Sequence, residues 1–241
     1  MASVDRYDNR WRARWRTPDG KQRSRVFTRK LDAQRHLTNV EHQKLVGGYV
    51  DPRAGKVTFR SYAEQWSARQ IWRPSSADAF AAAFARVFPV IGDRPVAQLR
   101  TSELQALVKK LSATLAPATV GATHRRVAAV LKAAVVDRVL TSSPATGVKL
   151  PRVDRPRVQP LELGQVLALA EAMPERARAT VLFAAGSGLR IGETLGLTVD
   201  RVDFLRRTVT VDRQMVTPSR GEPGFGPPKT PSSRRTCRSR R

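Results

Sequence analysis

One short stretch, residues 186–197, holds the side chain best suited to bind an oxygen anion. Arg190 carries a planar guanidinium that can donate to two oxygens at once, and it stands where the free backbone N–H groups of a helix N-terminus would lie. Together these donors would form a clamp for a phosphate group. An ordinary ion pair with a carboxylate such as Glu193 is the alternative, and the residues alone do not separate the two interpretations.

Two helices joined by a tight reversal must position Arg190. An apolar helix is expected over residues 180–185, and it ends at two glycines because glycine readily adopts the positive φ values of a reversal. A second helix restarts at once. Ile191 and Leu195 are four residues apart, so they are expected to form its buried side and to leave Arg190 pointing elsewhere.

Further along the chain, short strands and a loop lead to a lysine. Apolar residues alternate over residues 202–211 as they do in short strands. A loop rich in glycine and proline, residues 217–228, then reaches Lys229. An ordinary solvated loop lysine is one interpretation of this position.

The positions around Arg190 form an ordered pattern: Gly188, Leu189, Arg190, Ile191, Gly192 and Glu193, followed by Leu195, Leu197, Asp200 and Asp203. Pro228, Lys229 and Thr230 follow. This pattern resembles the first conserved box of the tyrosine recombinases, the phage-integrase family, together with a downstream lysine. The order of the domains described below resembles that family over almost the whole chain.

The resemblance implies transesterification at a DNA phosphodiester. In that family a tyrosine attacks phosphorus, arginines and histidine-like residues stabilise the developing charge, and a lysine on a β-hairpin protonates the leaving 5′ oxygen. Arg190 matches the first arginine and Lys229 matches the hairpin lysine, so these are the two expected catalytic residues. Glu193 matches a neighbouring position with an orienting or capping role. No metal and no cofactor is expected.

The rest of the family's catalytic set is missing after Arg190. All tyrosines and histidines lie upstream of it, namely Tyr7, Tyr49, Tyr62, His36, His42 and His124. The basic tail, residues 237–241, is expected to be strandless where a hairpin should be completed. We therefore expect a chain truncated within its catalytic domain, by a frameshift or a premature stop, and inactive alone. A non-catalytic DNA-binding or architectural protein that occupies attachment sites is the alternative.

The composition indicates a polyanionic partner. The 241 residues include 44 Lys and Arg against 20 Asp and Glu, which gives a net charge of +24. This balance favours double-stranded DNA, and the spread of the charge over several segments disfavours a membrane surface. A single cysteine, Cys237, excludes an internal disulfide. No signal sequence or membrane span is visible, so the cytoplasm is the expected location.

The first segment of the chain reads as a small sheet covered by a helix. Strict alternation over residues 7–16 predicts one half-buried strand, with tryptophans on one face and arginines on the other. Residues 21–27 read as the returning strand of a hairpin. The expected DNA-contacting residues here are Arg10, Arg12, Arg14, Arg16, Lys21, Arg23 and Arg25, and a merely solvated face is the alternative.

A helix is expected after this hairpin, with Thr28 as its N-cap. Ala33, Leu37 and Val40 give it one apolar face to lay on the sheet. The module resembles the arm-type DNA-binding domain of phage integrases, whose sheet lies in the major groove of DNA. A linker with several glycines, residues 47–55, follows it.

The middle of the chain is expected to be a bundle of four helices. Apolar residues recur at helical spacing in four stripes: Phe59, Tyr62, Ala63 and Trp66; Phe80, Phe84 and Val87; Leu104, Leu107, Val108 and Leu111; Val120, Val127, Leu131 and Val135. The aromatic residues are expected in the core. Arg125 and Arg126 are expected to contact DNA. A proline-rich connector, residues 142–160, then leads to a second helix-rich unit that begins near Leu161.

The expected fold class is therefore a multidomain α+β chain. Residues 1–50 are expected to form the arm-type DNA-binding-like domain, residues 56–150 the helical core-binding domain, and residues 157–241 the N-terminal part of an incomplete mixed α/β catalytic domain. The expected partners are double-stranded DNA at attachment sites and, on that DNA, further copies of the chain or a full-length integrase.

Overall fold

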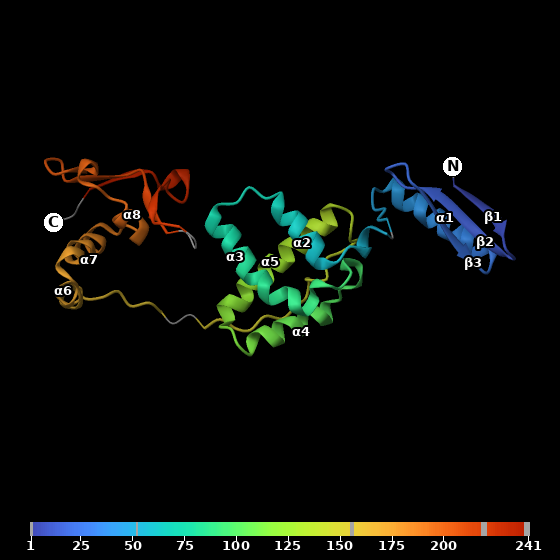
Figure 1. The fold of residues 1–241 in the computed structure, drawn as a ribbon, viewed down its shortest axis with the longest axis horizontal. Helices are drawn as coiled ribbons and strands as arrows, with labels where there is room; N and C mark the ends of the chain where they lie inside the picture. The colour runs from blue at the N-terminus through green and yellow to red at the C-terminus, as the bar shows by residue number, and fades with distance from the viewer. Residues whose placement is uncertain (1, 52, 155–156, 218–220, 239–241) are drawn as a thin grey trace. The chain divides into compact units, whose positions relative to one another are not determined.

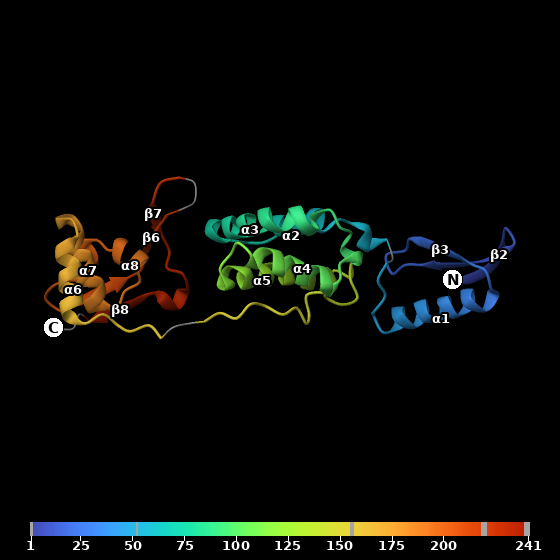
Figure 2. The same cartoon turned by 90° about the horizontal axis from the view of Figure 1, so that it is seen from below.

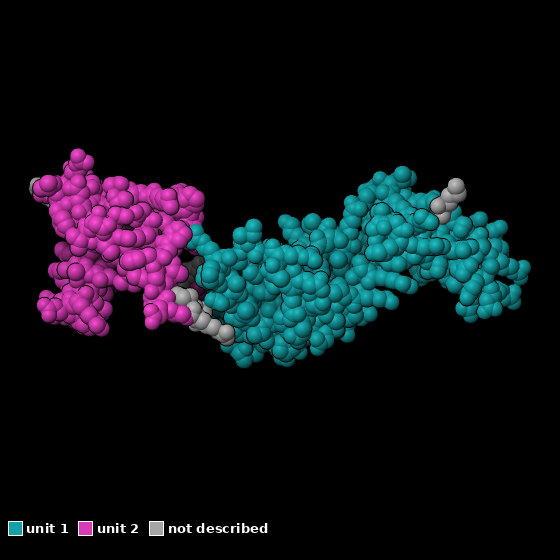
Figure 3. All heavy atoms as spheres, turned by 45° about the horizontal axis from the view of Figure 1, so that its top comes forward, with its two compact units in different colours: residues 1–153 teal, residues 154–241 magenta. Residues whose placement is uncertain are grey.

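The protein is described by a computed structural model that covers residues 2–51, 53–154, 157–217 and 221–238. The chain divides into two compact units, residues 1–153 and residues 154–241, which are coloured separately in Figure 3. Both units mix helices with small sheets, so the expected α+β class is confirmed. The division of the first unit into an arm-type domain and a helical domain stays a prediction.

The first unit opens with a three-stranded antiparallel sheet (Figure 1). Its strands are β1 (Ser3–Tyr7), β2 (Arg10–Arg16) and β3 (Gln22–Phe27), in the order β1-β2-β3. The prediction of a single strand over residues 7–16 was wrong. Asp8 and Asn9 have φ values of 46° and 59°, so they form a tight hairpin turn that places β1 beside β2. Asp and Asn tolerate positive φ better than most residues.

Helix α1 (Lys30–Leu45) lies along one face of this sheet, as Figure 2 shows. Ala33, Leu37 and Val40 are buried against Ala13 and Trp15, which confirms the predicted apolar face. The predicted N-cap was wrong, because the cap residue is Arg29 and no side chain caps the helix there. The helix is therefore held by its packing on the sheet more than by its first turn.

Part of the segment expected to be a linker belongs to the core of this module. Tyr49 is buried beneath the sheet, and its hydroxyl oxygen accepts a hydrogen bond of 2.8 Å from Trp15 Nε1. Two residues later, Asp51 accepts a bidentate ion pair from Arg23, with a closest approach of 2.6 Å. These two contacts hold Tyr49 and Asp51 against the three-stranded sheet.

Replacing Tyr49 by Phe is expected to destabilise this module by about 1–3 kcal/mol, because the buried Trp15 N–H would lose its partner. The free energy of unfolding from urea titration, followed by tryptophan fluorescence, measures the loss. Tyr7→Phe is the matched control, since Tyr7 is 49% exposed. Equal stability of the two variants would contradict the assignment of Tyr49 to the core.

The rest of the first unit is the predicted bundle of four helices (Figures 1 and 2). They are α2 (Phe59–Ala68), α3 (Pro74–Val87), α4 (Thr101–Ser112) and α5 (Pro117–Val136). Their apolar stripes form one core, with Phe59, Phe84 and Leu131 almost completely buried. Pro74 and Pro117 each stand at the first position of a helix, where the missing N–H costs no intrahelical hydrogen bond.

Short turns complete the first unit: η1 (Ala54–Lys56), the π-helical η2 (Phe88–Gly92) and η3 (Val96–Gln98). The connector that follows, residues 142–160, has no helix or strand among its described residues; residues 155 and 156 of it, including Pro156, lie outside them. Its first part is nevertheless held to the bundle. The backbone of Lys149 exchanges two hydrogen bonds, of 2.8 and 3.0 Å, with the Gln105 side chain of α4.

The described residues of the second unit form three helices and two small sheets. The helices are α6 (Leu163–Ala172), α7 (Glu175–Ser187) and α8 (Ile191–Leu195). One sheet has the order β4 (Val202–Asp203), β5 (Thr208–Val211), β8 (Arg235–Arg238), and the other pairs β6 (Gln214–Val216) with β7 (Gly224–Gly226). Short 3-10 turns are η4 (Val199–Arg201) and η5 (Pro231–Ser233). Residues 218–220 of the expected loop lie outside the described residues.

The expectation of a strandless tail was wrong for residues 237 and 238. They belong to β8, which pairs antiparallel with β5 and places Cys237 opposite Val209. Cys237 packs against the small core around Val209 and Val211, and the neighbouring arginines point away from that core or into ion pairs. The backbone hydrogen bonds with β5 are therefore enough to form strand β8, although its apolar alternation is short. Residues 239–241 lie outside the described part of the chain.

The predicted buried face of α8 was also wrong. Ile191 and Leu195 are 68% and 51% exposed. The face that packs is instead the row of Gly192 and Gly196, which lies directly on strand β6: a Cβ at Gly196 would stand 2.7 Å from the backbone nitrogen of Met215. The missing side chains let the helix approach the strand closely, which a pattern of large apolar residues does not reveal.

Candidate functional site

One face of the first sheet is lined by arginines and is not covered by α1. Directly paired residues of antiparallel strands share a face, so the register places Asp5 and Tyr7 of β1 with the arginine row of β2. The row consists of Arg10, Arg12, Arg14 and Arg16. Trp11, Ala13 and Trp15 point to the other face, toward α1, as the alternation predicts. The uncovered face can therefore meet a flat or grooved anionic surface.

Asp5 lies in the middle of this face and binds two of its arginines. Its carboxylate accepts from Arg12 Nη2 at 2.7 Å and from Arg14 Nε at 3.0 Å. The hydrogen bond from Arg12, with the charges of both arginines, lowers the pKa of Asp5, so the carboxylate stays ionised at neutral pH. Arg10 and Arg16, at the two ends of the row, are exposed. These two have the greater freedom to contact phosphates.

The basic residues of the returning strand do not join this row. Arg23 pairs with Trp15 and Arg25 with Ala13 in the strand register, so both lie on the α1 side of the sheet. Arg23 is held by Asp51, and Arg25 stacks on the ring of Phe27. Lys21, in the turn, forms an exposed ion pair of 2.8 Å with Asp19. Sequence alternation could have separated these residues only if the register between the strands were known.

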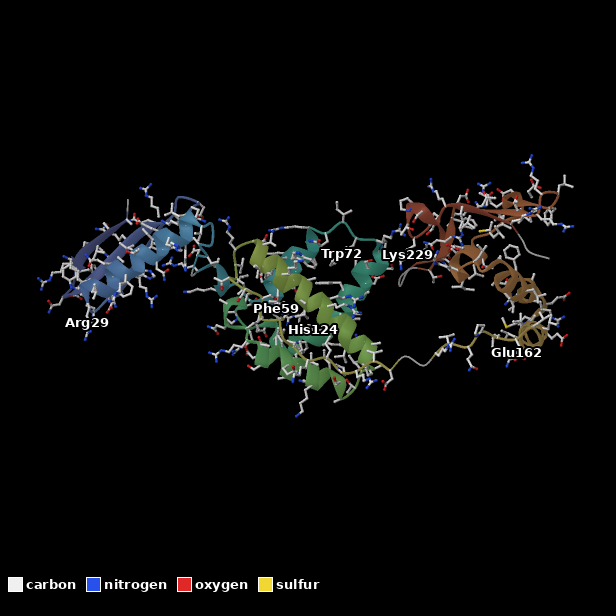
Figure 4. The ribbon with its side chains drawn as sticks, turned by 180° about the vertical axis from the view of Figure 1, so that it is seen from behind. Arg29, Phe59, Trp72, His124, Glu162 and Lys229 are labelled. Carbon is white, nitrogen blue, oxygen red and sulfur yellow. The ribbon has the colours of Figure 1, made fainter. Side chains whose placement is uncertain are left out.

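The two arginines expected to bind DNA in the bundle lie on α5, beside an aromatic hollow. Arg125 and Arg126 line this hollow together with Ser75, Ser76, Trp66, Trp72 and Phe80. Trp72, labelled in Figure 4, packs its ring 4.9 Å from that of Phe80, between centroids. Arg125 is exposed, whereas Arg126 also donates to the Ala122 carbonyl of its own helix at 3.3 Å. The hollow thus combines positive charge with aromatic surface.

Arg190 lies at the N-terminus of α8, after a reversal at Gly188 with φ of 65°. The reversal occurs as predicted, although of the two glycines only Gly188 has a positive φ. The side chain of Arg190 is 64% exposed and donates from Nη1 to Glu193 Oε1 at 3.0 Å. The ion pair with Glu193 and an exposed guanidinium therefore coexist, and the two sequence interpretations do not exclude each other.

Glu193 is the most deeply buried charged side chain near Arg190, with 2% exposure. A second arginine, Arg235 of β8, reaches it with Nη2 at 2.8 Å from Oε2 and Nη1 at 3.2 Å from Oε1. The hydrogen bonds from Arg235, followed by those from the Arg190 backbone and side chain, outweigh the burial of the carboxylate and lower the pKa of Glu193 to about 2. Glu193 is consequently charged at any physiological pH.

Lys229, labelled in Figure 4, is exposed in the bend that follows β7. The start of this bend is fixed by a hydrogen bond of 2.9 Å from Gln214 Nε2 of β6 to the Pro227 carbonyl. Its end is fixed where the Ser233 N–H donates to the Thr230 carbonyl at 3.0 Å. Strand β6 contacts both the bend before Lys229, through Gln214, and helix α8, which begins after Arg190. Among the described residues, no contact joins the side chains of Lys229 and Arg190.

Sequence reasoning missed two residues of these sites, Asp5 and Arg235. Asp5 could have been found from a hairpin turn at Asp8 and Asn9, which would have placed it opposite Arg12. Arg235 is 42 residues from Glu193 along the chain, and it gave no local signal. Only the pairing of β8 with β5 brings it there.

Comparison with known proteins bears on these sites. The model of the phage integrase central domain matches residues 59–150, which include the whole four-helix bundle. The integrase of Enterobacteria phage P4 is 28% identical over 152 residues, covering 56% of this chain and 35% of the phage protein. Over residues 59–150 the chain is thus similar to the central domain of phage integrases.

Two solved integrase structures share the fold. The integrase of transposon Tn1549 (residues 82–397 of that protein), in complex with transposon right end DNA, has a TM-score of 0.65 at 22% identity over 76% of this chain and 61% of the crystallised chain. A lambda integrase tetramer bound to a Holliday junction has a TM-score of 0.55 at 16% identity, over 93% of this chain and 68% of that protein. The chain thus spans about a third of the P4 integrase and about three fifths of the crystallised part of the Tn1549 integrase.

The described residues contain no helix that is both long and apolar enough to cross a membrane.

Proposed function

We propose that this chain binds double-stranded DNA at the attachment sites of a mobile element, as the DNA-binding part of a tyrosine recombinase. The observation that carries the proposal is the uncovered arginine face of the first sheet, because a small antiparallel sheet fits the major groove of B-form DNA. The net charge of +24 supports a polyanionic partner. The proposal places the chain with DNA in the cytoplasm.

A charge-removal experiment tests this proposal. The double variant Arg10→Gln, Arg16→Gln removes the two exposed arginines of the row, and its affinity for a duplex containing the attachment site is measured by fluorescence anisotropy. We expect weaker binding and a salt slope that is smaller by about two, one for each lost phosphate contact.

Arg29→Gln, Arg35→Gln is the matched control for this variant. It removes the same charge from the same module, but Arg35 lies on the outer side of α1 and Arg29 just before that helix, away from the arginine face. Equal losses in the two variants would show that overall charge, and not the sheet face, carries the binding. No loss in either would reject the sheet as a DNA contact.

We further propose that Arg190 binds a phosphate of the recombination site and that Lys229 stands ready as the acid for the leaving oxygen. An exposed guanidinium held by a buried carboxylate supports the first role. The resemblance of the lysine loop to the family's hairpin supports the second. Neither residue supplies a nucleophile, which the reaction needs in order to become covalent.

The 241-residue chain is therefore expected to form no phosphotyrosyl adduct with a nicked suicide substrate. Its tyrosines are all in the first unit, and two are buried: Tyr49 accepts from Trp15, and Tyr62 donates to Asp137 Oδ2 at 2.6 Å. Burial, with the neighbouring Asp137, raises the pKa of Tyr62 and disfavours its nucleophilic phenolate. Tyr7 is half exposed but lies beneath Arg12.

Denaturing electrophoresis of the protein with labelled substrate measures the adduct. A covalent band that disappears in Tyr7→Phe would show that the chain cuts DNA with an upstream tyrosine. Absence of the band, together with tight binding, is the expected result, and it is also compatible with a second candidate function, a non-catalytic protein that occupies attachment sites or acts beside a full-length integrase.

A further inference from the structure

We propose that Arg235 is a positioning residue: through the buried carboxylate of Glu193 it keeps one edge of the Arg190 guanidinium free for a phosphate oxygen. The inference rests on the proposed function for the identity of the ligand, and it assigns to Arg235 a role that the sequence pattern does not indicate. Three sets of contacts support it.

The first is the complete occupation of the Glu193 carboxylate. Oε1 accepts from Arg190 Nη1 at 3.0 Å and from Arg235 Nη1 at 3.2 Å, while Oε2 accepts from the Arg190 backbone N–H at 3.1 Å and from Arg235 Nη2 at 2.8 Å. Four donors match the acceptor capacity of a carboxylate. A buried carboxylate needs such partners, so both arginines are required to satisfy it.

The second set shows that the Arg235 guanidinium is occupied by hydrogen bonds within the protein. Two nitrogens of its guanidinium face Glu193, and Nη1 also donates to the Ser233 carbonyl at 3.0 Å. Its side chain is only 32% exposed, because β8 fixes its backbone opposite Val211 of β5. A guanidinium held this way has few donors left for an external anion.

The third set concerns Arg190, whose guanidinium is hydrogen-bonded on one side. Of its side-chain nitrogens, only Nη1 has a partner among the described residues, and the side chain is 64% exposed. Arg190 Nε and Nη2 can therefore donate to a phosphate oxygen while Nη1 stays on Glu193. Arg190 is therefore the arginine that can bind the phosphate, and Arg235 is the arginine that holds the Glu193 carboxylate.

The two arginines compete for one carboxylate, and this competition explains the positioning. Without Arg235, both oxygens of Glu193 would be open to Arg190, and a fork-to-fork pair is the preferred geometry of an arginine with a carboxylate. Arg190 would then turn its free edge onto Glu193. Loss of Arg235 should thus impair phosphate binding although Arg235 itself does not touch the phosphate.

A double-mutant cycle on duplex binding tests this role in the full chain. We expect Arg235→Gln to weaken binding about as much as Arg190→Ala, roughly three- to tenfold, and to have no further effect in the Arg190→Ala background. Arg234→Gln is the matched control, since it removes the same charge from an exposed neighbouring residue. Arg235→Lys keeps the charge but loses the planar guanidinium that can donate to two oxygens at once. Its affinity for the duplex should therefore lie between those of wild type and Arg235→Gln.

The outcomes of the cycle separate the possible roles. Additive losses in the double variant would show that Arg235 contacts the phosphate directly, and a loss no larger than that of Arg234→Gln would show that it has no role; either result overturns the proposal. A duplex affinity of Arg235→Lys equal to that of wild type would show that the two-nitrogen geometry of the Arg235 guanidinium is not needed.

A second measurement tests the inference without DNA. The Nε–Hε signal of Arg190 in ¹⁵N-labelled protein is followed by NMR during titration with inorganic phosphate. We expect a saturable shift in wild type and in Arg235→Lys, and its loss in Arg235→Gln. A shift without duplex binding would reject the proposed function and keep the clamp, whereas no shift in wild type would reject the clamp itself.

Discussion

Raising the salt concentration from 50 to 200 mM is expected to weaken duplex binding by about 10³- to 10⁴-fold. About six to eight phosphate contacts give a slope of roughly −5 to −7 in a plot of log affinity against log salt, because each contact releases condensed counterions from the DNA. The arginine face, Arg125 and Arg190 lie on three different elements, and each offers exposed guanidinium groups for such contacts. Anisotropy titrations at four or five salt concentrations measure the slope.

Asp5 gives this prediction an internal control. Asp5→Asn would remove the carboxylate that binds Arg12 and Arg14, while it keeps a side chain of the same size. We expect tighter duplex binding and a steeper salt slope, because two more guanidinium groups become available to phosphates. A flat salt response of the wild-type chain would contradict phosphate contact altogether and would favour an acidic protein as the partner.

Replacing Gly196 by Ala is expected to destabilise the second unit by about 3 kcal/mol or more, and to release α8 from β6. A Cβ at this position would stand 2.7 Å from the Met215 nitrogen and 2.8 Å from two backbone atoms of Gln214. Backbone atoms paired within a strand cannot turn aside as a flexible side chain can. The backbone of Gly196 itself has φ of −87°, which alanine adopts freely, so the effect arises from packing alone.

Gly186→Ala is the matched control for this change. Gly186 lies within α7, and a Cβ there would meet no heavy atom within 4 Å. Alanine favours the helix, so this variant should be as stable as wild type or more stable by up to about 1 kcal/mol. Thermal unfolding followed by circular dichroism measures both. Equal stability of the two variants would contradict the close approach of α8 to β6.

The Gly196→Ala variant should also lose the Arg190 site. The one-turn helix α8 packs on β6, and its position there sets where Glu193 meets Arg235. We therefore expect duplex binding by Gly196→Ala to fall to the level of Arg190→Ala, and not to that of the Arg10→Gln, Arg16→Gln variant. This comparison links the packing of the second unit to its proposed ligand.

Much of the architecture follows from local patterns in the sequence. The helical periodicity around Phe84 and Leu131 predicts the bundle, since side chains at i, i+3 and i+4 share a face whatever lies opposite. The alternation around Trp15 predicts which face of β2 is buried. The pattern around Arg190 predicts a reversal followed by a helix, because glycine has few rivals at positive φ. Each of these inferences uses residues close together in the chain.

The composition of the sites depended on pairings between distant segments. Strand register put Arg23 and Arg25 on the covered side of the sheet and Asp5 among the arginines, because a shift of one residue exchanges the two faces. The pairing of β8 with β5 brought Arg235 to Glu193, and the contact of α8 with β6 exposed Ile191. A local pattern shows which side of an element is apolar, but the partner that covers it, and the charges that this partner brings, are set by the free energy of the whole packed unit.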